Sequence, residues 1–234
     1  MNDGQPVEPS SATSAISSEM ALYVLVRRDQ TWRVAAGQYT PIRISMKPAT
    51  VEILFIQGGG QGAYAADQEL AANLRRSLGA GYEVRYPKMP NEDDPTYERW
   101  KGRLAKELAA LAAGSMIVAH SVGGPILLRY LAQKKVPTRI TALFFVAAPY
   151  FGTGGWSADG WNIGELVQQE TFVSQVTETR PVFFYHNRDD RIVPFAHLGL
   201  YKDQLPRATV RAFDHGGHQF DDGLSQLVRD IKSV

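Results

Sequence analysis

The chain has 234 residues, of which 44% are hydrophobic and 10% aromatic; this is typical of one globular domain and excludes a wholly disordered protein. Its 25 Lys and Arg residues balance 24 Asp and Glu residues, so the formal net charge of +1 provides no long-range field for nucleic acid or an anionic membrane. The absence of cysteine excludes disulfides, thiolate nucleophiles and Cys-bound metals, so any nucleophile must be an oxygen or a nitrogen.

Residues 1–19 contain many Ser residues and few large apolar ones, so we expect a disordered N-terminal tail. The segment has no basic start followed by an apolar run, so it does not resemble a secretory signal, and a cytoplasmic location is expected. The longest later apolar run, Ala142–Ala148, has the length of a strand, whereas a membrane span needs about 18 residues. No membrane span is therefore predicted.

Two short apolar segments after the tail predict an antiparallel meander. Ala21–Arg27 and Trp32–Ala36 have the composition of strands, and Asp29 and Gln30 lie where a turn would join them. Ile42–Met46 is a possible third strand of the same meander.

From residue 51 onward, short apolar runs alternate with longer amphipathic segments, which is typical of a mostly parallel sheet covered by helices on both faces. The predicted strands are Val51–Ile56, Tyr82–Tyr86, Ser115–Ala119, Thr141–Ala147, Val182–Tyr185 and Thr209–Ala212. The predicted helices are Ala66–Leu78, Thr96–Ala113, Gly124–Gln133, Ile163–Val176, Phe195–Lys202 and Asp222–Lys232. We expect one α/β domain over residues 20–234, with a short flap at about 150–181.

Ser121 is the first candidate catalytic residue in the sequence. It lies in Ala119-His-Ser-Val-Gly123, between a buried strand and a helix. A strand that turns abruptly into a helix strains the corner residue and requires small residues two positions before and after it. Such a turn would place the Ser121 hydroxyl at the sheet edge beside a helix N-terminus, which favours developing negative charge. We interpret Ser121 as a nucleophile; the alternative is an ordinary strand-to-helix turn that contains Ser and Gly.

A serine hydroxyl needs a base, and the chain has five histidines. His218 follows the last predicted strand, after two glycines that permit a tight loop, and from there it could accept the proton of Ser121. His215 is the alternative base, closer to the strand end. The remaining three are expected to pack or to form local hydrogen bonds: His120, His186 and His197.

The imidazole needs an acid that fixes its tautomer, and Asp190 follows another predicted strand. We choose Asp190 over Asp189 because Val193 and Pro194, three and four residues later, begin the next helix. The alternative is that both aspartates cap that helix or pair with neighbouring arginines. The order of nucleophile, acid and base, each directly after a strand, favours the catalytic interpretation.

The glycine-rich loop that starts at Gln57 could supply donors for an oxyanion. Its backbone amides can approach a substrate closely because glycine has no side chain. We assign one donor to the amide of Val122 and the other to Gly59 or Gly60. A phosphate loop is the rival interpretation, but the segment lacks the Gly-Lys-Ser/Thr ending and the G-x-G-x-x-G spacing.

With these motifs the chain resembles the α/β-hydrolase superfamily, over roughly Val51 to Lys232. The resemblance rests on four segments: the Gln57–Gly60 loop, the elbow Ala119–Gly123, Asp190-x-x-Val-Pro and Gly217-His218. The short chain and the motif Asp94-Pro-x-x-x-x-Trp100 are similar to small, nearly capless serine hydrolases such as retinoblastoma-binding protein 9.

The superfamily resemblance implies an eight-stranded, mostly parallel sheet whose second strand is antiparallel. It also implies a Ser-His-Asp triad that acts through an acyl-enzyme. Two residues depart from the usual pattern: Ala119 replaces the first elbow glycine, and Gln57 replaces the usual histidine of the glycine-rich loop.

The substrate pocket is the least specified part of the prediction. Aromatic residues could line an acyl site beneath the flap, although such a cluster is as often plain core. These candidates are Tyr64, Tyr150, Phe151, Trp156 and Trp161. Charged residues near the sheet edge, including Glu92, are expected to be solvated, and no His or carboxylate spacing predicts a metal site or a cofactor.

Taken together, these motifs predict a metal-independent serine hydrolase of small esters, thioesters or related acyl compounds. Ser121 would be the nucleophile, His218 the base and Asp190 the acid, with Gly59 or Gly60 and Val122 holding the oxyanion. The alternatives are an acyl transferase or C–C bond hydrolase on the same scaffold, and a binding protein without catalysis. The expected partner is a small acyl substrate; the oligomeric state is left open.

Overall fold

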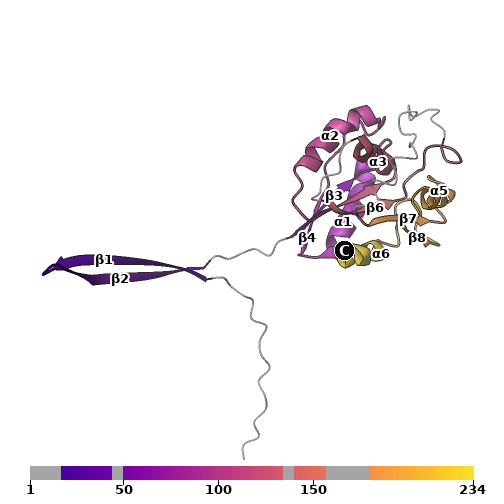
Figure 1. Ribbon diagram of the computed structural model, residues 1–234. Helices are drawn as coiled ribbons and strands as arrows, with labels where there is room; N and C mark the ends of the chain where they lie inside the picture. The colour runs from indigo at the N-terminus through magenta and orange to yellow at the C-terminus, as the bar shows by residue number, and fades with distance from the viewer. Residues whose placement is uncertain (1–16, 44–49, 134–139, 157–179) are drawn as a thin grey trace, which may run out of the picture. The chain divides into compact units, whose positions relative to one another are not determined.

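The computed structural model describes residues 17–43, 50–133, 140–156 and 180–234. The chain divides into two compact units, residues 1–49 and 50–234 (Figure 1). The predicted domain over residues 20–234 includes parts of both units.

The first unit contains an antiparallel hairpin of β1 (Ser17–Arg28) and β2 (Thr31–Arg43). Asp29 and Gln30 join the strands with φ of 48° and 63°, as a two-residue hairpin turn requires. The two predicted strands and their turn are confirmed. However, β1 begins inside the segment predicted as a tail, and residues 42–43 extend β2 instead of starting a third strand; residues 44–46 lie outside the described residues.

The second unit contains a six-stranded sheet in the order β4-β3-β5-β6-β7-β8, with every neighbouring pair parallel. Its strands are β3 (Val51–Ile56), β4 (Tyr82–Arg85), β5 (Ser115–His120), β6 (Ile140–Val146), β7 (Val182–Asn187) and β8 (Thr209–Phe213). Strands β5 and β7 are buried along their whole length, which explains why they are mostly apolar runs. All six predicted strands are confirmed within two residues of their ends.

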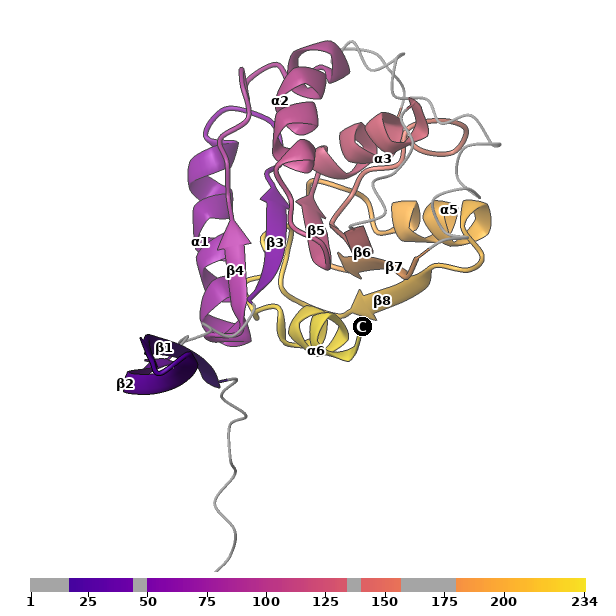
Figure 2. The same cartoon turned by 60° about the vertical axis from the view of Figure 1, so that its left-hand side comes forward.

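Helices cover both faces of this sheet (Figure 2). They are α1 (Ala63–Leu78), α2 (Tyr97–Ala109), α3 (Gly123–Gln133), α5 (Ala196–Gln204) and α6 (Ser225–Ser233). Side chains of α1 and α6 pack with one set of strand residues, and side chains of α2, α3 and α5 pack with the other set. The predicted helix over residues 163–176 and most of the flap lie outside the described residues.

The sheet differs from the eight strands that the superfamily resemblance implied. Within the described residues, the parallel sheet has six strands, and the antiparallel strands β1 and β2 pair only with each other. A two-residue turn lets the backbone groups of β1 and β2 pair with each other locally. Each parallel pair of strands, by contrast, needs a longer crossover connection. The expectation of an antiparallel second strand in the main sheet is therefore wrong for the described residues.

Parallel strands bring the segments that follow them to one edge of the sheet. The predicted site residues follow β3, β5, β7 and β8, so the topology gathers them at the carboxyl edge.

No helix in the described part of the chain has the length and apolar character to cross a membrane.

Candidate active site

Ser121 occupies a strained turn between β5 and α3. Its φ is 49°, in the left-handed region that side-chain-bearing residues rarely adopt. Its N–H donates to the carbonyl of Val146 at 2.9 Å, and its own carbonyl accepts from the N–H of Gly124 at 2.9 Å. A Cβ at Gly123 would collide with the carbonyl oxygen of Gln57, so the elbow requires glycine there. The expected elbow geometry is present, with Ser121 8% exposed.

The His218 side chain pairs with Asp190. Nδ1 of His218 lies 2.8 Å from Oδ2 of Asp190. Because Asp190 holds Nδ1, the lone pair of the neutral imidazole is at Nε2, which makes no hydrogen bond within the described part of the chain. With the proton on Nδ1, Nε2 can accept a proton, and the His218 side chain is 9% exposed.

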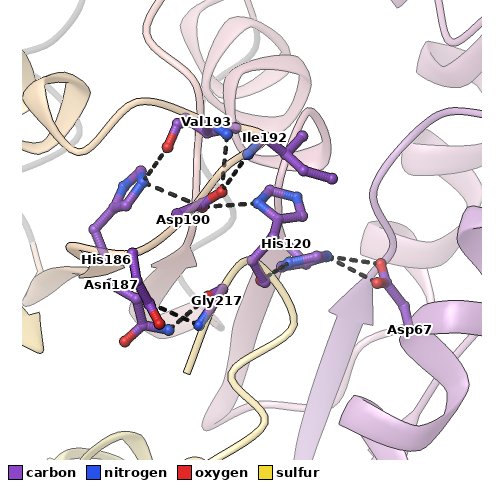
Figure 3. A network of polar contacts seen from close by, with 10 residues as sticks. Asp67, His120, His186, Asn187, Asp190, Ile192, Val193 and Gly217 are labelled. Atoms are coloured by element: carbon purple, nitrogen blue, oxygen red, sulfur yellow. Dashed lines mark hydrogen bonds and ion pairs between the residues drawn. The ribbon is translucent and has the colours of Figure 1, made fainter. Parts of the chain in front are cut away.

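Asp190 is held by hydrogen bonds on both oxygens (Figure 3). Its Oδ1 accepts from the backbone N–H groups of Ile192 and Val193 at 2.8 and 2.9 Å, and its Oδ2 lies 3.3 Å from Nε2 of His186. Burial raises the pKa of Asp190, but the hydrogen bonds from His186, His218 and the Val193 backbone outweigh it and leave the pKa below its usual value. The carboxylate is therefore ionised at neutral pH.

The pKa of His218 lies below its usual value of 6.5. Burial is the main cause, and charged His120 adds to it, while the hydrogen bond and charge of Asp190 oppose it. At neutral pH the imidazole is therefore neutral and able to accept a proton.

The loop that carries His218 is fixed by the last residue of β7 and by a residue just after it. Asp189 accepts from the N–H groups of Gly216 and Gly217 at 3.3 and 2.9 Å, and Asn187 donates to the carbonyl of Gly217 at 2.7 Å. The prediction did not assign Asn187 a role, and its position at the end of a strand would have been the only signal. His215, the alternative base, is exposed, and within the described residues it forms no hydrogen bond with Asp189 or Asp190.

Of the two predicted glycine donors, only Gly59 has an available amide. The N–H of Gly60 donates to the carbonyl of Glu92 at 2.6 Å, which argues against its assignment as an oxyanion donor. Gly59 packs against the side chains of Val122 and Pro95, and a Cβ there would clash with both. Within the described residues, the amides of Gly59 and Val122 donate to no other group, so both N–H groups are unused.

Gln57 supports the glycine-rich loop in place of the usual histidine. Its Oε1 accepts from the N–H of Met89 at 2.8 Å, and its Nε2 donates to Oε2 of Glu92 at 3.1 Å. The same carboxylate accepts from the N–H of Tyr64 at 2.6 Å. Glu92 was expected to be solvated; instead its side chain and its carbonyl both hold this loop, because the loop's amides need acceptors.

His120 and Asp67 form a second buried pair beside the first, which the sequence analysis missed. Both oxygens of Asp67 lie 2.9 Å from Nδ1 of His120, and Nε2 of His120 lies 3.0 Å from the carbonyl of His218. His120 was expected to pack locally. The sequence did contain an indication that Asp67 is buried. Asp67 stands three and four residues before Leu70 and Ala71, on the apolar face of α1.

The described aromatic candidates for the pocket fall into two places, with Tyr64 apart from the others. Tyr64 stacks on Tyr86 with ring centroids 4.7 Å apart and lines a cavity of about 240 Å³ along α1 that contains none of the predicted catalytic residues. Tyr150 and Phe151 are core residues, and Trp156 packs against the same core and lies edge-on to the His197 ring. Trp161 lies outside the described residues.

Comparisons with known proteins place the chain among hydrolases. A Bacillus subtilis (strain 168) protein named as a hydrolase, YdeN, is 27% identical over 155 residues, which are 65% of this chain and 79% of that protein. The crystal structure of the B. subtilis ydeN gene product superimposes with a TM-score of 0.59 and 22% identity, covering 79% of this chain and 98% of that one.

Two further solved structures share the fold at lower identity. Est1E from Butyrivibrio proteoclasticus has a TM-score of 0.58 and 15% identity, covering 90% of this chain and 96% of that chain. The meta-cleavage product hydrolase CumD from Pseudomonas fluorescens IP01 has a TM-score of 0.57 and 14% identity, covering 79% and 89%. The predicted α/β-hydrolase fold class is confirmed. A family model described as serine hydrolase matches residues 67–229, which span most of the chain, and the chain therefore belongs to the serine hydrolase family.

Proposed function

We propose that the protein hydrolyses small esters, thioesters or related acyl compounds, with Ser121 as nucleophile, His218 as base and Asp190 as the acid that orients it. The observation that carries the proposal is the hydrogen-bonded His218–Asp190 pair at the same sheet edge as the strained Ser121 turn. The unused amides of Gly59, which packs against the Val122 side chain, and of Val122 would provide the remaining requirement, a place for an oxyanion.

The first half-reaction forms an acyl-enzyme. Oγ of Ser121 attacks the substrate carbonyl carbon while its proton passes to Nε2 of His218. The carbonyl oxygen becomes an oxyanion that accepts hydrogen bonds from Gly59 and Val122. When the tetrahedral intermediate collapses, the bond to the leaving alcohol or thiol breaks, and His218 returns the proton to that group.

The second half-reaction uses water as the nucleophile. His218 takes a proton from the water, and the water oxygen attacks the acyl carbon. The carbonyl oxygen again becomes an oxyanion that accepts hydrogen bonds from the two amides. Collapse breaks the bond to Oγ of Ser121, which recovers its proton from His218, and the carboxylic acid leaves. Asp190 stabilises the imidazolium in both steps without itself taking the proton.

The proposal also includes three more specific properties predicted from the sequence. These are the similarity to retinoblastoma-binding protein 9, the absence of a metal requirement and the cytoplasmic location. Within the described ranges there is no cluster of three or more His, Cys, Asp or Glu side chains suited to a metal ion. The predicted mechanism needs none, because the two amides take the role of an electrophile.

A fluorophosphonate probe tests the proposed nucleophile. Folded protein should react with one equivalent, and peptide mass mapping should find the adduct on Ser121. Urea-denatured protein is the control and should not react, because an unactivated serine hydroxyl is a weak nucleophile. Absence of an adduct, or an adduct on another residue, would contradict the proposal.

The pH dependence of kcat/KM tests the base. His218 must be neutral to accept the proton, and its pKa lies below 6.5. Activity should therefore be fully present at neutral pH and fall as the pH drops through the lowered pKa, with a midpoint below 6.5. A pH-rate profile with an ester of non-ionising groups measures this, and a midpoint above 7 would contradict the assigned base.

A further inference from the structure

We propose that Asp67 and His120 form a buried ion pair that positions the catalytic machinery, with His120 holding the loop of His218 and Asp67 holding the loop of Gly59. The proposal rests on the proposed function for its kinetic consequences, but not for the existence of the pair. His120 and Asp67 act through other groups and are therefore positioning residues.

The hydrogen-bond partners of His120 define its protonation state. Nε2 faces the carbonyl of His218 at 3.0 Å, and a carbonyl can only accept, so Nε2 carries a proton. Nδ1 faces both oxygens of Asp67 at 2.9 Å. Oδ2 of Asp67 also accepts the N–H of Gly58 at 2.6 Å, which fits an ionised carboxylate. Both nitrogens of His120 are then donors, and the ring is an imidazolium.

Electrostatics favour the same charge state. Burial lowers the pKa of His120, but the charge and hydrogen bond of Asp67 outweigh it, so the pKa is above its usual value. Burial raises the pKa of Asp67, but His120, the Gly58 amide and the Gln219 side chain outweigh it, so the pKa is below its usual value. Both side chains are 1% exposed, so water does not screen the pair.

The pair connects three parts of the site that are distant in sequence. Asp67 lies on α1 and ties down the Gly58 amide, directly before the proposed oxyanion donor Gly59. His120 is the last residue of β5, directly before Ser121, and its ring lies 4.8 Å from the ring of His218. Figure 3 shows the carboxylate of Asp67 facing the ring of His120. A shift of either member would move a donor or the base relative to the nucleophile.

A matched pair of substitutions separates the positioning bond from the charge. The side-chain amide of asparagine lies near Nδ1 of a histidine and that of glutamine near Nε2. His120→Asn therefore keeps a donor toward Asp67 and loses the donor to the His218 carbonyl, whereas His120→Gln keeps the donor to that carbonyl. Both variants remove the same positive charge. We expect kcat of His120→Asn to be at least about tenfold below that of His120→Gln.

The same variants shift the titration of His218. The charged groups that face it are Asp190 from the segment after β7, His120 from β5 and Asp67 from α1. Removing the imidazolium of His120 removes its repulsion of a charged His218, so protonated His218 becomes more favourable and its pKa rises. The acid limb of kcat/KM should move to higher pH in both variants, and ¹⁵N NMR of His218 should show the same rise without any turnover.

Asp67→Asn provides a variant that keeps the His120 ring. At pH 7, ¹⁵N NMR of the wild-type protein should show both nitrogens of His120 protonated, whereas Asp67→Asn should show a neutral ring with the proton on Nε2. A neutral His120 in the wild type would overturn the ion pair. Equal kcat for His120→Asn and His120→Gln would overturn the positioning role. An unlabelled Ser121 would instead overturn the proposed function and leave the NMR results to decide the pair.

Discussion

Ser121→Ala should lower kcat for ester hydrolysis by about 10⁵- to 10⁶-fold, which is the scale measured when a catalytic serine is removed from a serine protease. The substitution removes the attacking oxygen and leaves the His218–Asp190 pair and the amides of Gly59 and Val122 in place. A residual rate above that of the uncatalysed reaction is expected, because the oxyanion donors still bind the developing charge. Stopped assays at high enzyme concentration measure this residual rate.

Ser115→Ala is the matched control for this substitution. Ser115 is the buried first residue of β5, at the other end of the strand from the elbow, and its hydroxyl donates to the carbonyl of Ala112 at 2.8 Å. Its replacement should cost about 1 kcal/mol of unfolding free energy and leave kcat within a few-fold of wild type. Comparable losses in the two variants would mean that the loss comes from stability and not from a missing nucleophile.

The regular part of the fold could be predicted from sequence because it follows from local patterns. Parallel strands buried on both faces must be continuous apolar runs, so β3, β5 and β7 stand out in the sequence. The Ser121 turn was equally visible, since the steric demand of the elbow at Gly123 acts within five residues. Such features need no knowledge of what lies across the sheet.

The parts that sequence reasoning missed depend on contacts between distant segments. Whether the N–H of Gly60 or that of Gly59 remains available depends on the carbonyl of Glu92, about thirty residues away in the chain. Glu92 and Asp67 have the appearance of ordinary surface acids until the chain folds over them and leaves backbone amides in need of acceptors. No single-sequence pattern specifies which amide each of them meets.

Asp190→Asn should lower kcat by about 10⁴-fold, the loss known for the equivalent change in serine proteases. The neighbouring amides determine how the new side chain orients. Oδ1 of Asp190 accepts two backbone N–H groups, so the carbonyl oxygen of the asparagine must stay there. Its NH₂ group then faces Nδ1 of His218, which can only accept this hydrogen bond if its own proton has moved to Nε2. The imidazole would present a proton to Ser121 where it needs a lone pair.

Asp189→Asn distinguishes this tautomer effect from a general disturbance of the loop. The two carboxylates are neighbours, and Asp189 holds the Gly216 and Gly217 amides with one oxygen each. An asparagine there loses one of these bonds but leaves His218 with its partner, so kcat should fall by no more than about tenfold. ¹⁵N NMR should find the His218 proton on Nε2 only when residue 190 is changed. A larger loss at Asp189, with the tautomer unchanged at Asp190→Asn, would show that loop position limits the rate and that the carboxylate of Asp190 does not orient the base.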